Sequence, residues 1–191
     1  MKYFDPYERS ILESEPLIKG IKTFKKDSET RRQELLKYMQ EGLVDLCLNH
    51  ADSLVLSVPG SRVLKEVYSS LASEDLVDGI LNLCQASLKK DEEVTIFEDP
   101  TGHLAIKNLI LSDVERENPL FSAKFLDRLG ENLMDVAKSN RGAFVVSSLF
   151  KVPSLKQKVS KILMLQRADI KKLSNQKGTN AGYKALLKEI S

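Results

Sequence analysis

Pro59-Gly60-Ser61-Arg62-Val63-Leu64-Lys65-Glu66-Val67 is the first copy of a sequence pattern that recurs twice more along the chain, and the fold prediction rests on this recurrence. Within it, apolar and polar residues fall on separate helical stripes, Val63, Leu64 and Val67 on one and Ser61, Arg62 and Lys65 on the other. The later copies are Thr101-Gly102-His103-Leu104-Ala105-Ile106-Lys107-Asn108-Leu109 and Arg141-Gly142-Ala143-Phe144-Val145-Val146-Ser147-Ser148-Leu149. One amphipathic helix repeated in this way predicts a stack of modules, and its free face is where function is expected.

Each copy follows an apolar segment whose spacing is also helical. The apolar positions are Leu43, Val44, Cys47, Ala51 and Leu54 in the first repeat, Leu76, Val77, Ile80 and Cys84 in the second, and Phe125, Leu126, Leu129, Leu133 and Val136 in the third. For the first repeat this predicts a helix pair at roughly 42–57 and 59–71, with a break permitted at Gly42 and Pro59 opening the second helix. The middle repeat is longer, and we place its insertion at the charged stretch 89–93.

A fourth, weaker copy closes the chain, with Ile162, Leu163, Ile170 and Leu173 in its first part and a last helix from Tyr183 to Ile190. Matching Leu64, Ile106, Val146 and Leu187 gives spacings of 42, 40 and 41 residues. A period near 40 predicts an all-α solenoid, because a single helix pair cannot bury its apolar face alone. Residues 1–29 are predicted to be a partly helical N-terminal segment, and residues 30–191 the repeat domain.

Composition limits the classes of function. The chain is 42% hydrophobic and 29% charged, which is typical of a globular protein, and it lacks an apolar run long enough for a membrane span or a signal peptide. Cys47 and Cys84 are expected to be buried thiols, and two histidines without a Cys/His cluster predict neither a metal site nor a cofactor. Residues 138–191 hold twelve Lys or Arg and two acids, which favours an anionic partner or a solvated lysine-rich helix face.

Three motifs in register resemble the Pumilio (PUF) repeat proteins and, more closely, the C-terminal CPL domain of the Penguin-like (Puf-A) family: residues 30–36, 98–104 and 140–143. The resemblance covers roughly residues 25–191. It implies a right-handed α-solenoid of about four PUF-like repeats that binds RNA or DNA with little sequence preference. It further implies action in the nucleolus, in ribosome biogenesis and pre-rRNA processing. The implied partners are RNA, including the rRNA precursor, DNA, pre-ribosomal particle proteins and, if the chain is a fragment, N-terminal PUF repeats of the same array; no membrane is implied.

In PUF repeats the first, second and fifth residues after the glycine face the bases. With Arg141, which could cap a helix or contact phosphate, they give the candidate nucleic-acid-binding residues Ser61, Arg62, Lys65, His103, Lys107, Arg141, Phe144 and Ser147. Arg62 can stack on a base or pair with phosphate, while Phe144 is either a stacking residue or buried. Leu104 and Ala143 also occupy base-facing positions, in the second and third copies. In the fourth copy the three base-facing residues would be Lys184, Ala185 and Lys188. No copy has the Asn/Gln or Ser/Glu pairing that reads a base, so recognition of a defined sequence is not expected.

The alternative is a protein-docking solenoid that holds an assembly factor or a ribosomal protein. The electrostatic character of the second-helix face discriminates the two functions. A positive strip that includes Arg62, Lys65 and Lys107 favours nucleic acid, whereas an apolar face around Leu104 and Phe144 favours a protein. An enzyme is not expected, because no serine has a histidine partner, no acidic pair has apolar surroundings and no glycine-rich loop could cradle phosphate.

Overall fold

The computed structural model describes residues 27–89, 94–175, 178 and 180–190, and no strand occurs in those ranges. The chain divides into two compact units, residues 1–42 and 43–191, so the division falls thirteen residues after the predicted boundary at 29/30. Residues 1–26 of the predicted N-terminal segment and residues 90–93 of the predicted insertion lie outside the described residues. None of the helices in the described ranges is long and apolar enough to cross a membrane. The predicted all-α fold is confirmed.

The helix α2 (Ser28–Asn49) runs from the first unit into the second without the break expected at Gly42. A methyl group at Gly42 would meet nothing within 4 Å, so no neighbouring segment forces the chain to turn there. Glycine adopts helical angles at a cost of only about 1 kcal/mol relative to alanine, which a long helix tolerates. The helix ends at Asn49 instead, and the short helix α3 (Ala51–Val55) follows.

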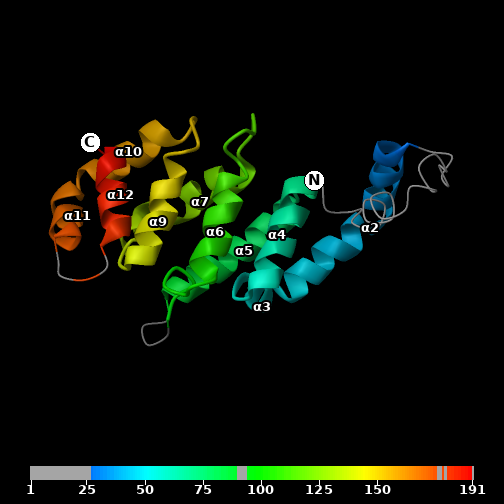
Figure 1. Ribbon diagram of the computed structural model, residues 1–191, viewed down its shortest axis with the longest axis horizontal. Coiled ribbons are helices and arrows are strands. Elements are labelled where there is room, and N and C mark those ends of the chain that lie inside the picture. The colour runs from blue at the N-terminus through cyan, green and yellow to red at the C-terminus, as the bar shows by residue number, and fades with distance from the viewer. Residues whose placement is uncertain (1–26, 90–93, 176–177, 179, 191) are drawn as a thin grey trace, which may run out of the picture. The chain divides into compact units, whose positions relative to one another are not determined.

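In the second unit, first and second helices of successive repeats form two rows. The second helices are α4 (Val58–Leu71), α6 (Gly102–Leu111), α9 (Asn140–Leu149) and α12 (Ala181–Ile190). The first-helix row holds α3, α5 (Glu74–Leu88) and α7 (Leu120–Leu129), which continues through the 3-10 turn η1 (Gly130–Asn132) into α8 (Leu133–Val136). The fourth repeat begins with α10 (Lys156–Met164) and α11 (Arg167–Ser174). Each second helix packs against the next, from α4 to α12, and α5 packs against α7 (Figure 1).

One continuous apolar core lies between the two rows. The predicted core positions of α5, Leu76, Val77, Ile80 and Cys84, are fully or almost fully buried, and so are Phe125, Leu129, Leu133 and Val136 of the third repeat. Phe121 of α7 packs edge-on against Tyr68 of the first repeat, and Phe125 packs edge-on against Phe97 of the second, at centroid distances of 5.9 and 6.3 Å. Because these rings belong to different repeats, each repeat completes the core of its neighbour.

The first three second helices begin with the same local structure. A side-chain oxygen three residues before the glycine accepts a hydrogen bond from the glycine N–H: Ser57 for Gly60 (3.2 Å), Asp99 for Gly102 (2.7 Å) and Ser139 for Gly142 (2.9 Å). A methyl group on each glycine would lie less than 3.0 Å from the carbonyl oxygen six residues upstream. The glycine is therefore required for close packing of the second helix on the segment before it, and the capping oxygen satisfies an N–H that the helix leaves open.

The fourth repeat departs from this pattern, and the register predicted for it was wrong by one residue. Gly182 occupies the glycine position, and its N–H donates to the side-chain oxygen of Asn140 in the preceding repeat (2.7 Å). Leu186, rather than Leu187, is the fully buried residue that matches Leu64. The residues equivalent to Ser61, Arg62 and Lys65 are consequently Tyr183, Lys184 and Leu187.

Both cysteines are free and buried, as predicted, and their burial should show in their reactivity. Burial raises the pKa of the Cys47 thiol and raises that of Cys84 to about 12. Because only the thiolate attacks alkylating reagents, we expect both residues to react at least about 100-fold more slowly with iodoacetamide at pH 8 in the folded protein than in denaturant. Mass spectrometry of the alkylated peptides checks this, and rapid labelling of either cysteine in native buffer would contradict it.

Candidate nucleic-acid interface

The two rows of helices differ in charge. The second helices carry six Lys or Arg and two Glu, whereas α3, α5, α7, η1 and α8 carry two basic and seven acidic residues. Both basic residues of the first-helix row are neutralised: Lys124 contacts Glu74 and Asp78 at 3.0 Å, and Arg128 contacts Asp78 at 2.8 Å. These carboxylates, Asp78 first, raise the pKa of Lys124. Free positive charge in this part of the unit is therefore concentrated on the second helices.

On α4, the predicted residues Arg62 and Lys65 are exposed and form no ion pair with any residue in the described ranges. Ser61 donates its hydroxyl hydrogen to the carbonyl of Val58 in its own helix (2.9 Å) and is half-buried. Arg62 and Lys65 lie three positions apart and therefore share one face of α4. This helix presents two cations in the way that the sequence predicted.

On α6, the predicted residues have unequal access to solvent. His103 sits at the helix start, where its Nδ1 lies 2.7 Å from the carbonyl oxygen of Asp99, so the ring is bound to the loop before it. Leu104, at the stacking position, is 45% exposed. Lys107 extends toward the neighbouring second helix, where its ammonium lies over the ring of Phe144 at 5.7 Å from the centroid. The structure thus brings together two predicted residues, Lys107 and Phe144, from adjacent repeats.

On α9, most of the helix is buried because α6 and α12 pack on either side of it. Ser147 is only 8% exposed and Ala143 is fully buried, so a contact of Ser147 with a base is not supported. Phe144 is half-buried beneath Lys107. Arg141 donates from Nη1 to the carbonyl of Glu98 (2.9 Å), which ties the start of α9 to the loop before α6. This bond goes to the preceding repeat and does not cap a helix, whereas the side chain is exposed and its contact with phosphate stays a prediction.

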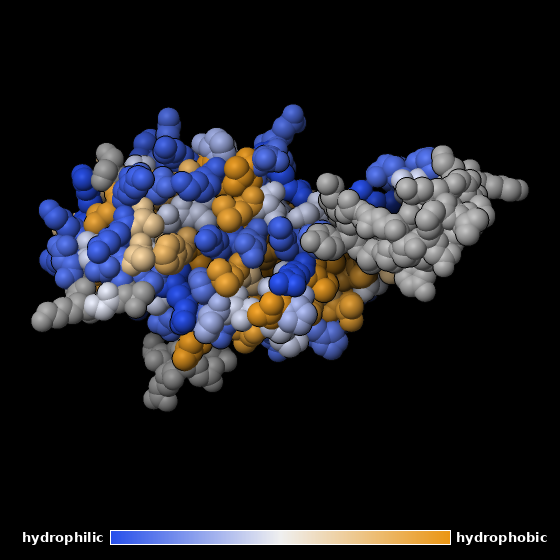
Figure 2. Space-filling view, viewed as in Figure 1, coloured by the Kyte–Doolittle hydropathy of each residue, from blue (hydrophilic) through white to orange (hydrophobic). Residues whose placement is uncertain are grey.

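The fourth repeat extends the basic surface. Lys184 and Lys188 on α12 are exposed and form no ion pair within the described part of the chain, whereas Lys151 pairs with Glu189 at 2.6 Å. On the face seen in Figure 2, hydrophilic and hydrophobic residues are interspersed over the second helices. Val63 on α4, which is 41% exposed, and Leu104 on α6 are exposed apolar side chains of these helices. The surface of the second helices is basic overall, but apolar side chains interrupt its cations.

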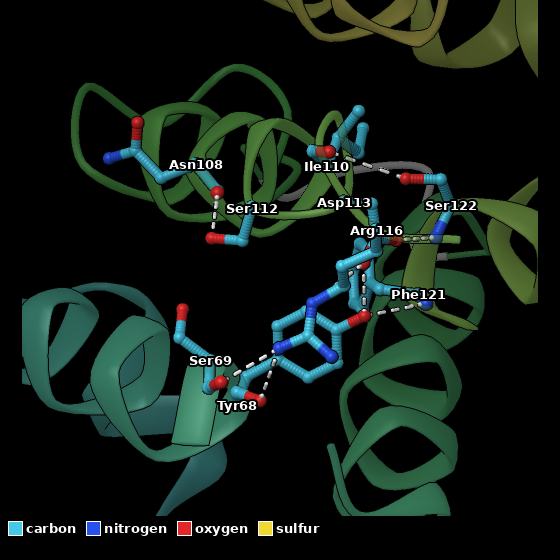
Figure 3. A network of polar contacts seen from close by, with 9 residues as sticks. All are labelled: Tyr68, Ser69, Asn108, Ile110, Ser112, Asp113, Arg116, Phe121 and Ser122. Atoms are coloured by element: carbon cyan, nitrogen blue, oxygen red, sulfur yellow. Dashed lines mark hydrogen bonds and ion pairs between the residues drawn. The ribbon is translucent and has the colours of Figure 1, made fainter. Parts of the chain in front are cut away.

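A buried polar junction joins the first three repeats, and no pattern in the sequence indicated it (Figure 3). The fully buried Asp113 accepts a hydrogen bond from the hydroxyl of Tyr68 and another, at 2.7 Å, from the backbone N–H of Ser122. The Tyr68 hydroxyl in turn accepts from the N–H of Phe121 (2.9 Å). Arg116 lies over the Tyr68 ring, 4.9 Å from its centroid, and donates to the carbonyls of Tyr68 and Ser69. These contacts fix α4 and α6 relative to α7.

The hydrogen bonds of the junction hold the helices in place. Burial, and then the hydrogen bond to Asp113, raise the pKa of Tyr68 well above its ordinary value, so the hydroxyl stays protonated and can donate. Within the described ranges, no three His, Cys, Asp or Glu side chains come together in a way that could hold a metal ion. The basic surface of the second helices is the candidate site, and the junction sets the spacing of its first two helices.

Comparison with known proteins relates this arrangement to one family. The family model of the CPL (NUC119) domain matches residues 1–119, starting before and ending well short of the range 25–191 inferred from motifs. Pumilio homolog 3 of Homo sapiens is 31% identical over 177 residues, 87% of this chain and 27% of the human protein. For Danio rerio the identity is 30% over 167 residues, 81% of this chain and 26% of that protein. The chain thus spans about a quarter of the length of these curated relatives.

Two solved structures have the same fold. The crystal structure of human Puf-A superposes with a TM-score of 0.77 and 29% identity, over 95% of this chain and 36% of that one. The crystal structure of human Puf-A in complex with DNA gives a TM-score of 0.74 and 29% identity, over 94% and 35% of the two chains. The likeness confirms the α-helical repeat fold predicted from the period near 40 residues and the PUF-like architecture that the family resemblance implied.

Proposed function

We propose, since the chain belongs to the CPL (NUC119) domain family, that its second-helix surface binds RNA, and also DNA, with little regard for base sequence. The observation that carries this proposal is the set of exposed cations on the first and the last second helix, α4 and α12, that have no acidic partner among the described residues: Arg62, Lys65, Lys184 and Lys188. Such cations can replace the counterions of a phosphate backbone without first breaking an ion pair. That human Puf-A was crystallised with DNA supports the same conclusion.

The chemistry of the base-facing positions supports binding without sequence reading. Ser147 and Tyr183 are buried, and Leu104 has no ring on which a base could stack. Phe144 has a ring, but the ammonium of Lys107 already lies over it. Repeat proteins that read bases need two or three accessible polar side chains on each second helix. Contacts with phosphate therefore dominate the proposed interface.

In the cell, we place this binding in the nucleolus, in pre-rRNA processing during ribosome biogenesis, with the rRNA precursor as the RNA and pre-ribosomal proteins as neighbours. Family membership supports this placement. A fluorescently tagged protein in eukaryotic cells, combined with ultraviolet crosslinking and sequencing of the bound RNA, tests it. Exclusion from the nucleolus, or crosslinks mainly to mRNA, would refute it.

The double substitution Arg62→Ala/Lys65→Ala is expected to weaken binding to unrelated RNAs by the same factor. Loss of two phosphate contacts should also lower the slope of log K against log salt by about 1.4 for a single strand. Fluorescence anisotropy with two unrelated RNAs at about 50 and 200 mM salt measures both effects. Lys124→Ala/Arg128→Ala, which removes two paired cations from the other row, is the matched control and should leave affinity nearly unchanged. A strong preference of the wild type for one RNA would contradict the proposal.

The second candidate function is docking of a protein, and the exposed apolar side chains Val63 and Leu104 favour it. Val63 follows Arg62 on α4, and Leu104 lies three positions before Lys107 on α6. An assembly factor or a ribosomal protein with an acidic, partly apolar segment would fit such a mixed surface. Leu104→Ser separates the two functions, because it should impair capture of a protein partner while leaving salt-dependent RNA binding intact.

A further inference from the structure

The turn between α10 and α11 exposes two neighbouring apolar side chains. Leu165 is 92% exposed, the highest value for any large apolar residue in the described ranges, and Met164 beside it is 59% exposed. Single exposed leucines are common on protein surfaces and need no explanation. Met164 and Leu165, in contrast, form an adjacent exposed pair at the tip of the turn between two helices, and no described residue buries Leu165.

The surroundings of this tip are strongly basic. The helices α10 and α11 carry six Lys or Arg and one acid, and that acid, Asp169, pairs with Lys172 at 3.0 Å. Lys158, Lys161 and Lys171 are exposed and form no ion pair with a described residue. The exposed lysines therefore favour a polyanionic partner, whereas Met164 and Leu165 favour a partner that also offers an apolar contact.

The local geometry brings the two properties onto one face. Leu165 has helical backbone angles (φ −66°, ψ −22°), so it extends the last turn of α10. Residues three, four or seven positions apart share a helix face, which aligns Lys158 and Lys161 with Leu165. The tip thus presents two lysines followed by an apolar end. Both helices pack against α12, at the C-terminal end of the second unit (Figure 1).

A nucleic acid fits this combination better than a membrane or a protein. Two apolar side chains make too small a face for an interfacial helix, which needs an apolar stripe along its length. Base steps, in contrast, are opened by single wedges of Leu, Ile, Met or Phe, with basic residues holding the flanking phosphates. Such a wedge enters most easily where stacking is already weak, as at a bulge or a mismatch.

We propose that Met164 and Leu165 form an apolar wedge that enters between neighbouring bases of a nucleic acid whose phosphates contact Lys158, Lys161 and Lys171. The wedge is separate from the second-helix surface, although its ligand class rests on the proposed function. It gives this end of the unit a preference for helical defects, which is a preference for shape and not for sequence.

The test compares a fully paired RNA hairpin with the same hairpin carrying a single-nucleotide bulge, each with 2-aminopurine beside the bulge position. We expect the wild type to bind the bulged hairpin roughly ten-fold more tightly and to increase its fluorescence, because a wedge unstacks the probe. Met164→Ser/Leu165→Ser should abolish both the preference and the fluorescence increase. Because both side chains are exposed and no charge changes, folding and the salt dependence should stay as in the wild type.

Control variants separate the possible failures. Lys158→Ala/Lys161→Ala should weaken binding to both hairpins equally, and a DNA hairpin of the same design shows whether the sugar matters. An unchanged preference and fluorescence increase in the Met164→Ser/Leu165→Ser variant would overturn the wedge, even if Arg62→Ala/Lys65→Ala weakens binding as proposed. Absence of nucleic-acid binding by the wild type would overturn both proposals. Leu165-dependent binding to phosphatidylserine vesicles, without a change in 2-aminopurine fluorescence, would assign the tip to a membrane and overturn the wedge.

Discussion

Asp113→Ala is expected to lower the free energy of unfolding by about 3–5 kcal/mol, because it removes one member of a buried, charged hydrogen-bond network. The carboxylate holds the hydroxyl of Tyr68 and the N–H of Ser122, and it lies 3.7 Å from the Nε of Arg116. Without it, two buried donors lose their acceptor and Arg116 loses its counter-charge. In a chain of 191 residues this corresponds to a fall in Tm of roughly 6–20 °C.

Two control variants make the Asp113 experiment specific. Tyr68→Phe removes only the bridging hydroxyl and should cost about 1–3 kcal/mol. Asp127→Ala removes an exposed carboxylate from the neighbouring helix α7 and should change stability by less than about 0.5 kcal/mol. Thermal and urea unfolding followed by circular dichroism measure all three. An Asp113→Ala protein as stable as Asp127→Ala would show that the junction contributes little.

The same network predicts how stability changes at alkaline pH. Since the pKa of Tyr68 is raised in the folded state, the folded protein keeps this proton at pH values where the unfolded chain loses it. The resulting stabilisation is complete below the unfolded pKa of about 10 and is lost as the pH rises above that value. Melting at pH about 8 and 10.5, with phenolate absorbance recorded, should show tyrosine ionisation that coincides with unfolding.

The second large effect is expected from Gly142→Ala. The added methyl group would lie less than 3.0 Å from the carbonyl oxygen of Val136, which is backbone and cannot rotate away. The helix α9 would have to move away from α8, and α6 and α12 pack on its other sides. We expect a loss of about 3 kcal/mol or more, at the upper end of the range for overpacking.

Gly130→Ala is the matched control for this substitution. Its methyl group would meet only the side-chain methyl groups of Ile162 and Leu126, at 3.6 and 3.7 Å, which is ordinary van der Waals contact. The residue has helical angles (φ −57°), so alanine should be neutral or should stabilise by up to about 1 kcal/mol. Equal melting temperatures for Gly142→Ala and Gly130→Ala would contradict the close packing described at the start of α9.

The sequence predicted the repeat architecture because packing imposed a local signal. Gly60, Gly102 and Gly142 mark the starts of three second helices, and each lies close to a carbonyl oxygen six residues earlier. The capping residues Ser57, Asp99 and Ser139 also lie three positions before each glycine, but the sequence prediction did not include them in the repeat pattern. In the fourth repeat the cap is Asn140, 42 residues away, so no local pattern marked Gly182 and the register slipped by one residue.

The candidate site was less predictable, because access depends on the neighbouring helices. Arg62 and Ser147 come from corresponding second helices, yet Arg62 is exposed at the first repeat and Ser147 is covered where α9 lies between two others. Asp113 gave no signal, because the tyrosine that it holds lies 45 residues upstream. An acidic residue after an apolar helix is usually solvated, and only the packing of α4 against α6 and α7 reveals its role.

The contacts between repeats also affect how the second unit loses its structure. Most side-chain hydrogen bonds that join separate repeats connect residues 38 to 53 positions apart, so each repeat is held by the one before it and the one after it. Cooperativity in such an array is passed from neighbour to neighbour, and a terminal repeat can open while the interior stays folded. The fourth repeat is held by Gly182 and Tyr183 of α12, which bond to Asn140 and Lys138. Opening α12 alone would detach Lys184 and Lys188 from the rest of the surface, so the proposed nucleic-acid footprint should shorten as the temperature rises.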